Sequence, residues 1–344
     1  MPKPHPRALT IALLVASMLT LAIVLGSRNL RDFDSALIGY AVATVFAALG
    51  VTYRFVGWLT RPPTYLYWVR GWQLFASWEN FRRFGGLIPR VIVNNLATQL
   101  FILPRGLDRW IMHLGLFWGT VLASAITFPL VFGWFRFRAS GDGEYQMLAL
   151  GTPIANFPAR SALGFLIFHA LDVAALLVLG GVVIALWRRW TDREVMAGQE
   201  FGFDFVPLFL LAAISITGLM LTASSLLWRG SFYWFVSLTH QGLVILTILY
   251  VPFGKFWHIL ERPASIGIEL YKRVAGARHS WVCQRCHRTY VSPLFVSDLK
   301  ETLRNLNQDY TMGAAGEWLQ DFCPECKRVL RANTYFDQVE RGFL

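Results

Sequence analysis

Charged residues are scarce in this chain of 344 residues, of which they make up 15% against about a quarter in an ordinary soluble protein. Acidic residues are the scarcer kind, with 21 Asp and Glu against 32 Lys and Arg. So little charge excludes a disordered chain and argues against an ordinary soluble domain. The basic excess would suggest nucleic-acid binding if it formed one patch, but the basic residues flank apolar blocks instead. We therefore expect no nucleic-acid partner.

Cysteine is also scarce, because only four residues of this type occur and all lie after residue 282. This placement argues against a disulfide framework spread over the fold. The cysteines form two C-x-x-C pairs, Cys283 with Cys286 and Cys323 with Cys326. Two such pairs bring four sulfurs toward one point, and the sequence therefore predicts a four-thiolate metal site.

Two metals suit such a site: zinc, or a single iron of the rubredoxin type. Rubredoxin pairs usually carry glycine directly after the second cysteine, and here His287 and Lys327 occupy those positions. This departure favours zinc, which would close a structural site without carrying electrons.

Apolar residues are abundant, at 55% of the chain, and they gather into blocks of about 20, the length that crosses a hydrocarbon layer about 30 Å thick. No alternating ten-residue pattern occurs, so a helical bundle is favoured over a barrel. The first block lacks a small-x-small cleavage site, so we expect an anchor and not a removed signal. Six blocks qualify as spans: 9–25, 36–53, 110–132, 162–187, 205–228 and 234–260.

The distribution of arginine and lysine predicts a multi-pass protein of the cell's inner membrane with both termini in the cytoplasm. The predicted organisation has four parts: two N-terminal membrane helices (1–60), a cytoplasmic amphipathic segment at the membrane interface (61–107), a four-helix bundle (108–262) and a small cytoplasmic zinc-ribbon-like domain (263–344). Within the bundle, the outer connection 133–160 is rich in glycine and proline, which predicts an irregular loop.

Four histidines fall within the predicted spans, where ionisable side chains are costly and are candidates for function. At about 1.5 Å per residue, His113 and His258 share the inner level of the membrane, and His169 and His240 share the outer level. His240 and His258 are 18 residues apart, which predicts that both project from one face of one helix. Each level then has two imidazoles that can hold a haem iron from both sides. The alternative is four separate packing histidines.

The sequence around these histidines resembles a known family. Residues 239–243 (THQGL) and 250–258 (YVPFGKFWH) are similar to the final helix of the respiratory nitrate reductase gamma subunit, and residues 108–115 (DRWIMHLG) to that family's histidine-bearing helix. The wider family of membrane cytochromes b includes membrane subunits of heterodisulfide reductases and of sulfite-reduction-associated complexes. The resemblance covers roughly residues 108–273.

The resemblance implies one or two b haems. It implies that His113 and His258 ligate an inner haem and that His240 ligates an outer one. The family's second outer ligand falls at Ala123, so we expect His169 to replace it. The family passes electrons between a quinone pool and an iron-sulfur or other soluble redox subunit, which here would dock on the cytoplasmic face and hold the substrate site.

Asp172 lies one helical turn after His169, and two roles remain open for it. It is a candidate for proton exchange with quinone, and it is also placed to orient the histidine through a hydrogen bond. A different class of function is a redox-inert anchor that recruits a soluble enzyme through the zinc-ribbon tail. A transporter ranks last, because no paired half-repeats or broken helices are evident.

Overall fold

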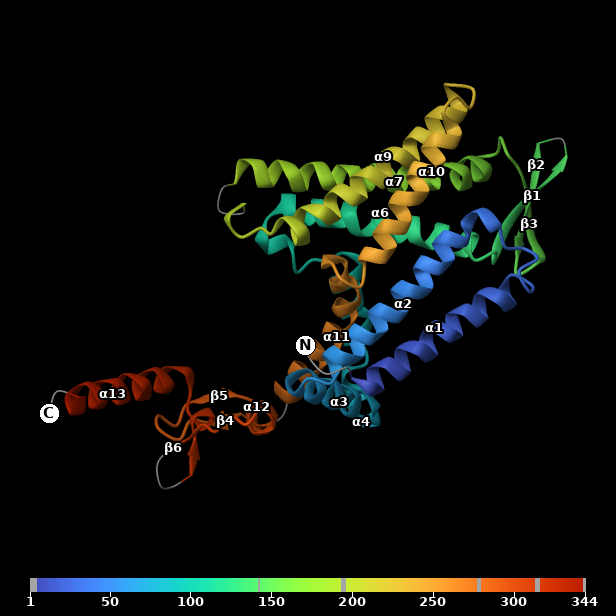
Figure 1. Ribbon diagram of the computed structural model, residues 1–344. Coiled ribbons are helices and arrows are strands. Elements are labelled where there is room, and N and C mark those ends of the chain that lie inside the picture. The colour runs from blue at the N-terminus through green and yellow to red at the C-terminus, as the bar shows by residue number, and fades with distance from the viewer. Residues whose placement is uncertain (1–4, 142, 193–195, 277–279, 313–315, 343–344) are drawn as a thin grey trace. The chain divides into compact units, whose positions relative to one another are not determined.

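The computed structural model describes residues 5–141, 143–192, 196–276, 280–312 and 316–342. Helices dominate this part of the chain (Figure 1). Six of the helical segments there are long and apolar enough to cross a membrane, in agreement with a helical membrane protein. These segments are α1 (Pro6–Gly26), α2 (Ile38–Leu59, preceded by the 3₁₀ turn Ser35–Leu37), α6 (Leu107–Val131), α7 (Ala162–Thr191), α9 (Val206–Leu226, preceded by the π-helical turn Phe201–Phe205) and α10 (Tyr233–Tyr250).

The chain divides into two compact units. The first combines Met1–Val56 with Asn94–Glu261 and contains the four histidines of the predicted haem sites. The second combines Gly57–Val93 with Arg262–Leu344 and contains the four cysteines. The two candidate sites therefore belong to different units.

Small residues let α6 and α7 approach closely. A Cβ atom added at Gly115 would lie 2.8 Å from the carbonyl oxygen of Leu177, and one added at Gly181 would lie 2.8 Å from that of Met112. Such close backbone approach is a common way to pair helices in lipid, where the hydrophobic effect does not drive association. Helix α7 also packs on α9, and α9 on α10. A cluster of buried side chains fills the space between α7 and α9: Val178, Val182, Ala185 and Leu208.

The connection between α6 and α7 is a small antiparallel sheet, so the prediction of an irregular loop was wrong. Phenylalanine and arginine alternate over residues 135–138, a period of two that is typical of a strand. Leu150 and Gly151 both have positive φ, 48° and 83°, as a two-residue hairpin turn requires. The strands, in sheet order, are β1 (Phe135–Gly141), β2 (Glu144–Ala149) and β3 (Thr152–Pro158).

The last predicted span is not one helix. Helix α10 ends at Tyr250, the 3₁₀ turn Lys255–Trp257 follows, and α11 (His258–Gly276) then begins. Pro252 lacks the N–H group that a continuing helix would use, and Gly254 is extended at φ −95° and ψ −168°. Gly254 lies so close to the ring of Tyr250 that a Cβ atom would not fit there. These two residues make a corner, 251–257, between α10 and α11.

In the second unit, the buried carboxylate of Asp298 joins three helices. Its side chain is 2% exposed and accepts hydrogen bonds from Arg70 Nε at 3.3 Å and from the hydroxyl group of Tyr271 at 2.7 Å. Arg70 lies in α3 (Pro62–Ala76) and Tyr271 in α11, so the predicted interfacial segment and the C-terminal residues share one core.

The remaining described elements are not candidate spans, and most belong to the second unit. They are α3 (Pro62–Ala76), α4 (Trp78–Phe84), α5 (Leu87–Ile92), the π-helical turn Val93–Ala97, the 3₁₀ turn Leu103–Arg105, β4 (Trp281–Val282), β5 (Thr289–Val291), α12 (Pro293–Asn305), β6 (Thr311–Met312), β7 (Glu317–Trp318), the 3₁₀ turn Leu319–Asp321 and α13 (Pro324–Gly342).

Candidate histidine and cysteine sites

The four histidines lie on four helices. His113 is in α6, His169 in α7 and His240 in α10, whereas His258 is the first residue of α11. The prediction that His240 and His258 share one face of one helix was therefore wrong. It assumed an unbroken helix, and the corner 251–257 interrupts the 3.6-residue repeat between them.

The inner pair, His113 and His258, lies close together in the first unit. The ring centroids of His113 and His258 lie 6.2 Å apart, and the ring planes make an angle of 72°. Imidazole–metal bonds of about 2.0–2.1 Å place two ligating nitrogens on opposite sides of one ion about 4 Å apart, and the ring centroids farther apart than that. A separation of 6.2 Å is thus compatible with one metal ion between the two rings.

Both inner rings are held through Nδ1. His258 Nδ1 lies 2.6 Å from the carbonyl oxygen of Lys255, which can only accept, so Nδ1 donates and the ring's acceptor lone pair is on Nε2. His113 Nδ1 lies 2.5 Å from Oε1 of Gln99, and Gln99 is buried, at 3% exposed. A metal-ligating histidine usually donates its other ring N–H group to a carbonyl or carboxylate oxygen, and this hydrogen bond fixes the orientation of the ring.

His169 is held by an acidic side chain. Its Nδ1 lies 2.8 Å from Oδ2 of Asp172, and the hydroxyl group of Thr222 donates to Oδ1 at 2.7 Å. Both oxygens of Asp172 therefore have partners, and these contacts are those of a residue that orients His169.

His240 is held by a hydroxyl group. Its Nδ1 lies 2.9 Å from Thr217 Oγ1, which in turn lies 2.7 Å from the carbonyl oxygen of Ala213. Thr217 has one hydroxyl proton, and donation to Ala213 leaves its oxygen to accept from His240. In the tautomer set by these contacts, the lone pair of His240 is on Nε2.

The outer histidines are not brought together as the inner pair is. Within the residues that the structure describes, no ring contact joins His169 to His240. Helix α9 instead contacts His240 through Thr217, and it contacts Asp172, the acceptor of His169, through Thr222. The outer haem pair therefore stays a prediction.

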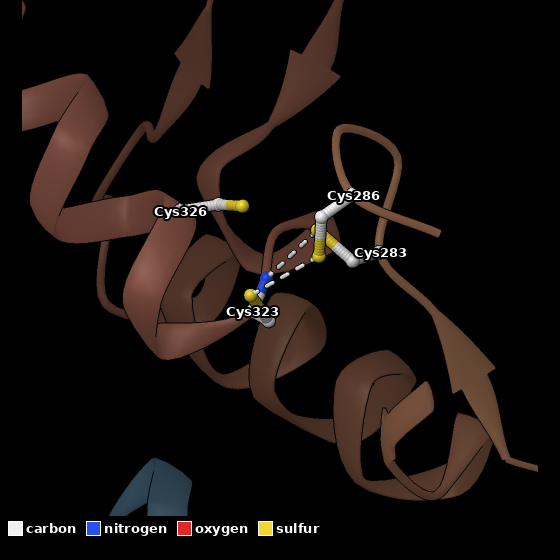
Figure 2. A group of neighbouring side chains, drawn as sticks. All are labelled: Cys283, Cys286, Cys323 and Cys326. Carbon is white, nitrogen blue, oxygen red and sulfur yellow. Dashed lines mark hydrogen bonds between the residues drawn. The ribbon is translucent and has the colours of Figure 1, made fainter. Parts of the chain in front are cut away.

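The four cysteines form one cluster in the second unit (Figure 2). Their sulfur atoms all lie within 4.8 Å of one another, and Cys286 Sγ lies 3.7 Å from Cys323 Sγ. Sulfurs bound tetrahedrally to zinc at about 2.3 Å would lie about 3.8 Å apart. The cluster could therefore hold a metal ion such as zinc.

Different local structures present the two cysteine pairs. The first pair lies in the turn between β4 and β5, which closes with His287 at a positive φ of 53°, at one of the two positions where rubredoxin pairs usually carry glycine. The second pair lies at the start of α13, where Pro324 follows Cys323 and begins the helix. Proline therefore places the second pair at a helix N-terminus, whereas the first pair lies in a turn between two strands.

Backbone N–H groups favour thiolate in the cluster. Burial opposes ionisation of Cys283, but donors from Cys286, Cys323 and Arg285 outweigh it and lower the pKa of the Cys283 thiol to about 6. Burial and the neighbouring sulfurs raise the pKa of Cys326 to about 12. Four sulfurs this close repel one another as thiolates, and a divalent cation would remove that repulsion.

Sequence reasoning missed the groups that orient three of the histidines: Gln99, Thr217 and the carbonyl of Lys255. Asp172 was found because it lies one turn from its histidine. Thr217 and Gln99 carry no such signal, since their partners lie 23 and 14 residues away on other elements.

Comparison with known proteins yields no relative: no family model, no curated protein and no solved structure matches this chain.

Proposed function

We propose that the chain is the membrane cytochrome b subunit of a multi-subunit oxidoreductase, and that it passes electrons between a quinone pool and a soluble iron-sulfur partner. The substrate site would lie on that partner. The observation that carries the proposal is the inner pair, in which the rings of His113 and His258 lie 6.2 Å apart and each forms a hydrogen bond through Nδ1.

The inner residues fit a haem. His113 and His258 would hold it through Nε2, and the bound haem would supply one-electron chemistry. Gln99 and the carbonyl of Lys255 would keep the two rings oriented.

A second haem is proposed for His169 and His240, with Thr217 and Asp172 as their orienting groups. Asp172 is also our candidate for proton exchange with quinone. Because its two oxygens already accept hydrogen bonds from His169 and Thr222, orientation is the role that its contacts support better.

For the cysteine cluster we propose structural zinc. All four ligands are thiolates and leave no open position, which is the composition of a closed structural site. A single iron is the alternative, and it would make the cluster an electron relay to the soluble partner.

The visible spectrum of the purified chain tests the proposal. We expect a reduced-minus-oxidised spectrum of a low-spin b haem, at least one haem per chain, and reduction by a short-chain quinol. A colourless protein from haem-replete cells would instead favour the redox-inert anchor, whose recruiting surface would be the cysteine domain.

A further inference from the structure

The N-terminal helix α2 packs on the corner 251–257 that precedes His258. The rings of Phe46 and Phe253 lie 6.3 Å apart. One turn further along α2, Gly50 faces Pro252 so closely that an added Cβ atom would lie 2.9 Å from the Cβ of that proline. The corner is therefore fitted against α2, with only a glycine tolerated at the point of closest approach.

Arg54, one more turn along α2, makes two contacts with the same corner. Its Nη1 atom donates a 2.7 Å hydrogen bond to the carbonyl oxygen of Pro252. That carbonyl lies two residues beyond the end of α10, where no helical N–H group follows to bond it, and Arg54 supplies the donor. The guanidinium carbon also lies 4.8 Å from the centroid of the Trp257 ring, in cation–π geometry.

Trp257 is a buried residue of this corner and directly precedes His258. Its side chain is 5% exposed, and its ring meets that of Phe55 edge-on at 5.9 Å. His258 follows it directly in the chain, and the Nδ1 acceptor of His258 is the carbonyl of Lys255 in the same turn. The position and the rotation of the His258 ring are thus set by the corner that α2 holds.

We propose that Arg54 is a positioning residue for His258, and that the N-terminal helix α2 is thereby a working part of the inner site. The inference rests on the proposed function, because it concerns how a ligand histidine is oriented. It extends that proposal to a helix outside the part of the chain that resembles the cytochrome b family.

Three variants of the full-length chain test the role of Arg54. Arg54→Ala removes both contacts, and Arg54→Lys keeps a charge and a donor without the planar face. Arg61→Ala is the matched control, since Arg61 is an exposed arginine that lies just after α2, at the start of α3. Each variant is first checked for monodispersity, and haem is then transferred to excess apomyoglobin to measure retention.

Outer-shell residues of metal sites typically change affinity by about 10–100-fold. We expect Arg54→Ala to speed haem loss from the inner site about 10-fold, Arg54→Lys to fall between it and wild type, and Arg61→Ala to match wild type. The EPR signal of the ferric inner site should also shift in Arg54→Ala, because it depends on the angle between the axial imidazole planes. A merely destabilised fold would not produce that shift.

The outcomes separate the two proposals. A haem-free wild type would overturn the proposed function and this inference with it. Wild-type haem content together with unchanged retention and EPR signal in Arg54→Ala would overturn the inference alone. If Arg54→Ala is not monodisperse, Arg54→Lys decides, and a wild-type EPR signal and retention in that variant would count against the planar contact with Trp257.

Discussion

The hydroxyl group of Thr217 in α9 lies 2.9 Å from Nδ1 of His240 in α10, and five residues along α9 the hydroxyl group of Thr222 donates to Asp172, the acceptor of His169. Helix α9 therefore contributes to the hydrogen bonds that orient both histidines of the proposed outer site. This arrangement makes α9 the element on which the proposed outer haem depends.

The outer site is tested by removing each histidine in turn. If His169 and His240 ligate one haem, His169→Ala and His240→Ala should abolish the same spectral component and lower the haem content by about one per chain, because a low-spin b haem needs both axial ligands. Loss in one variant but not in the other would separate the pair. A wild-type chain with a single haem would eliminate the outer site.

Adjacent glycines in α7 give a matched test of helix packing. A Cβ atom at Gly181 would lie 2.7 Å from Cγ of Leu116, whereas one at Gly180 would have nothing within 4 Å. Gly181→Ala should destabilise by about 1–3 kcal/mol through overpacking and disturb the helix that carries His113. Gly180→Ala should be neutral or slightly stabilising. Thermal unfolding in detergent measures both, and equal transition temperatures would contradict the close packing of α6 on α7.

Acid should loosen the turn between α1 and α2. Asp32 has a side chain that is 2% exposed and lies 2.6 Å from Arg28, and Arg136 of β1 also pairs with it. The hydrogen bond from Arg28, followed by the charge of Arg136, outweighs burial and holds the pKa of the Asp32 carboxyl below its usual value. A lowered carboxyl pKa stabilises the fold above the unfolded value of about 3.9, and this contribution is lost as the pH falls through the folded pKa.

Asp32→Asn should therefore lower the unfolding temperature at pH 7. Both arginines are about half exposed, so we expect a loss of about 1–2 kcal/mol and not the larger cost of breaking a fully buried pair. The difference from wild type should shrink below pH 4. Glu144→Gln, an exposed carboxylate in β2, is the control, and an equal effect in both variants would contradict a specific role for Asp32.

The metal of the cysteine cluster is tested by elemental analysis with a ligand variant. We expect about one zinc and no non-haem iron per chain, because four thiolates leave no open position. Cys283→Ser should lose the metal and expose the C-terminal residues to protease, while Gln284→Ser in the same turn should retain both. Haem spectra should not change in either variant. Stoichiometric iron with a reducible thiolate-to-iron band would overturn the structural assignment.

The apolar blocks located the long helices well, because a run of about twenty apolar residues that crosses a bilayer must satisfy its own backbone hydrogen bonds, as a helix does. This pattern failed at the corner 251–257, where the apolar run continues through Pro252 and Gly254 although the helix does not. Hydropathy cannot distinguish a continuing helix from one that ends in a corner, because it reports which side chains are apolar and says nothing of the backbone conformation. The aromatic–arginine alternation at 135–138 did carry the signal of a strand, and the nearby glycines and prolines obscured it.

The sequence grouped His113 with His258 by counting residues from the predicted inner ends of two spans, and the structure brings these two rings within 6.2 Å of each other. The orienting groups could not be found in this way. Gln99, Arg54 and Thr217 reach their partners across 14 residues or more, through helix packing that no local pattern encodes.

The most direct test of the central claim is the haem content and the reduced-minus-oxidised spectrum of His113→Ala and His258→Ala, with His5→Ala as a histidine outside the four. Because the two rings share one site at 6.2 Å, each of the first two variants should lose the same spectral component and about one haem per chain, and His5→Ala should match wild type. Full haem content and an unchanged spectrum in either His113→Ala or His258→Ala would contradict the assignment of the inner site.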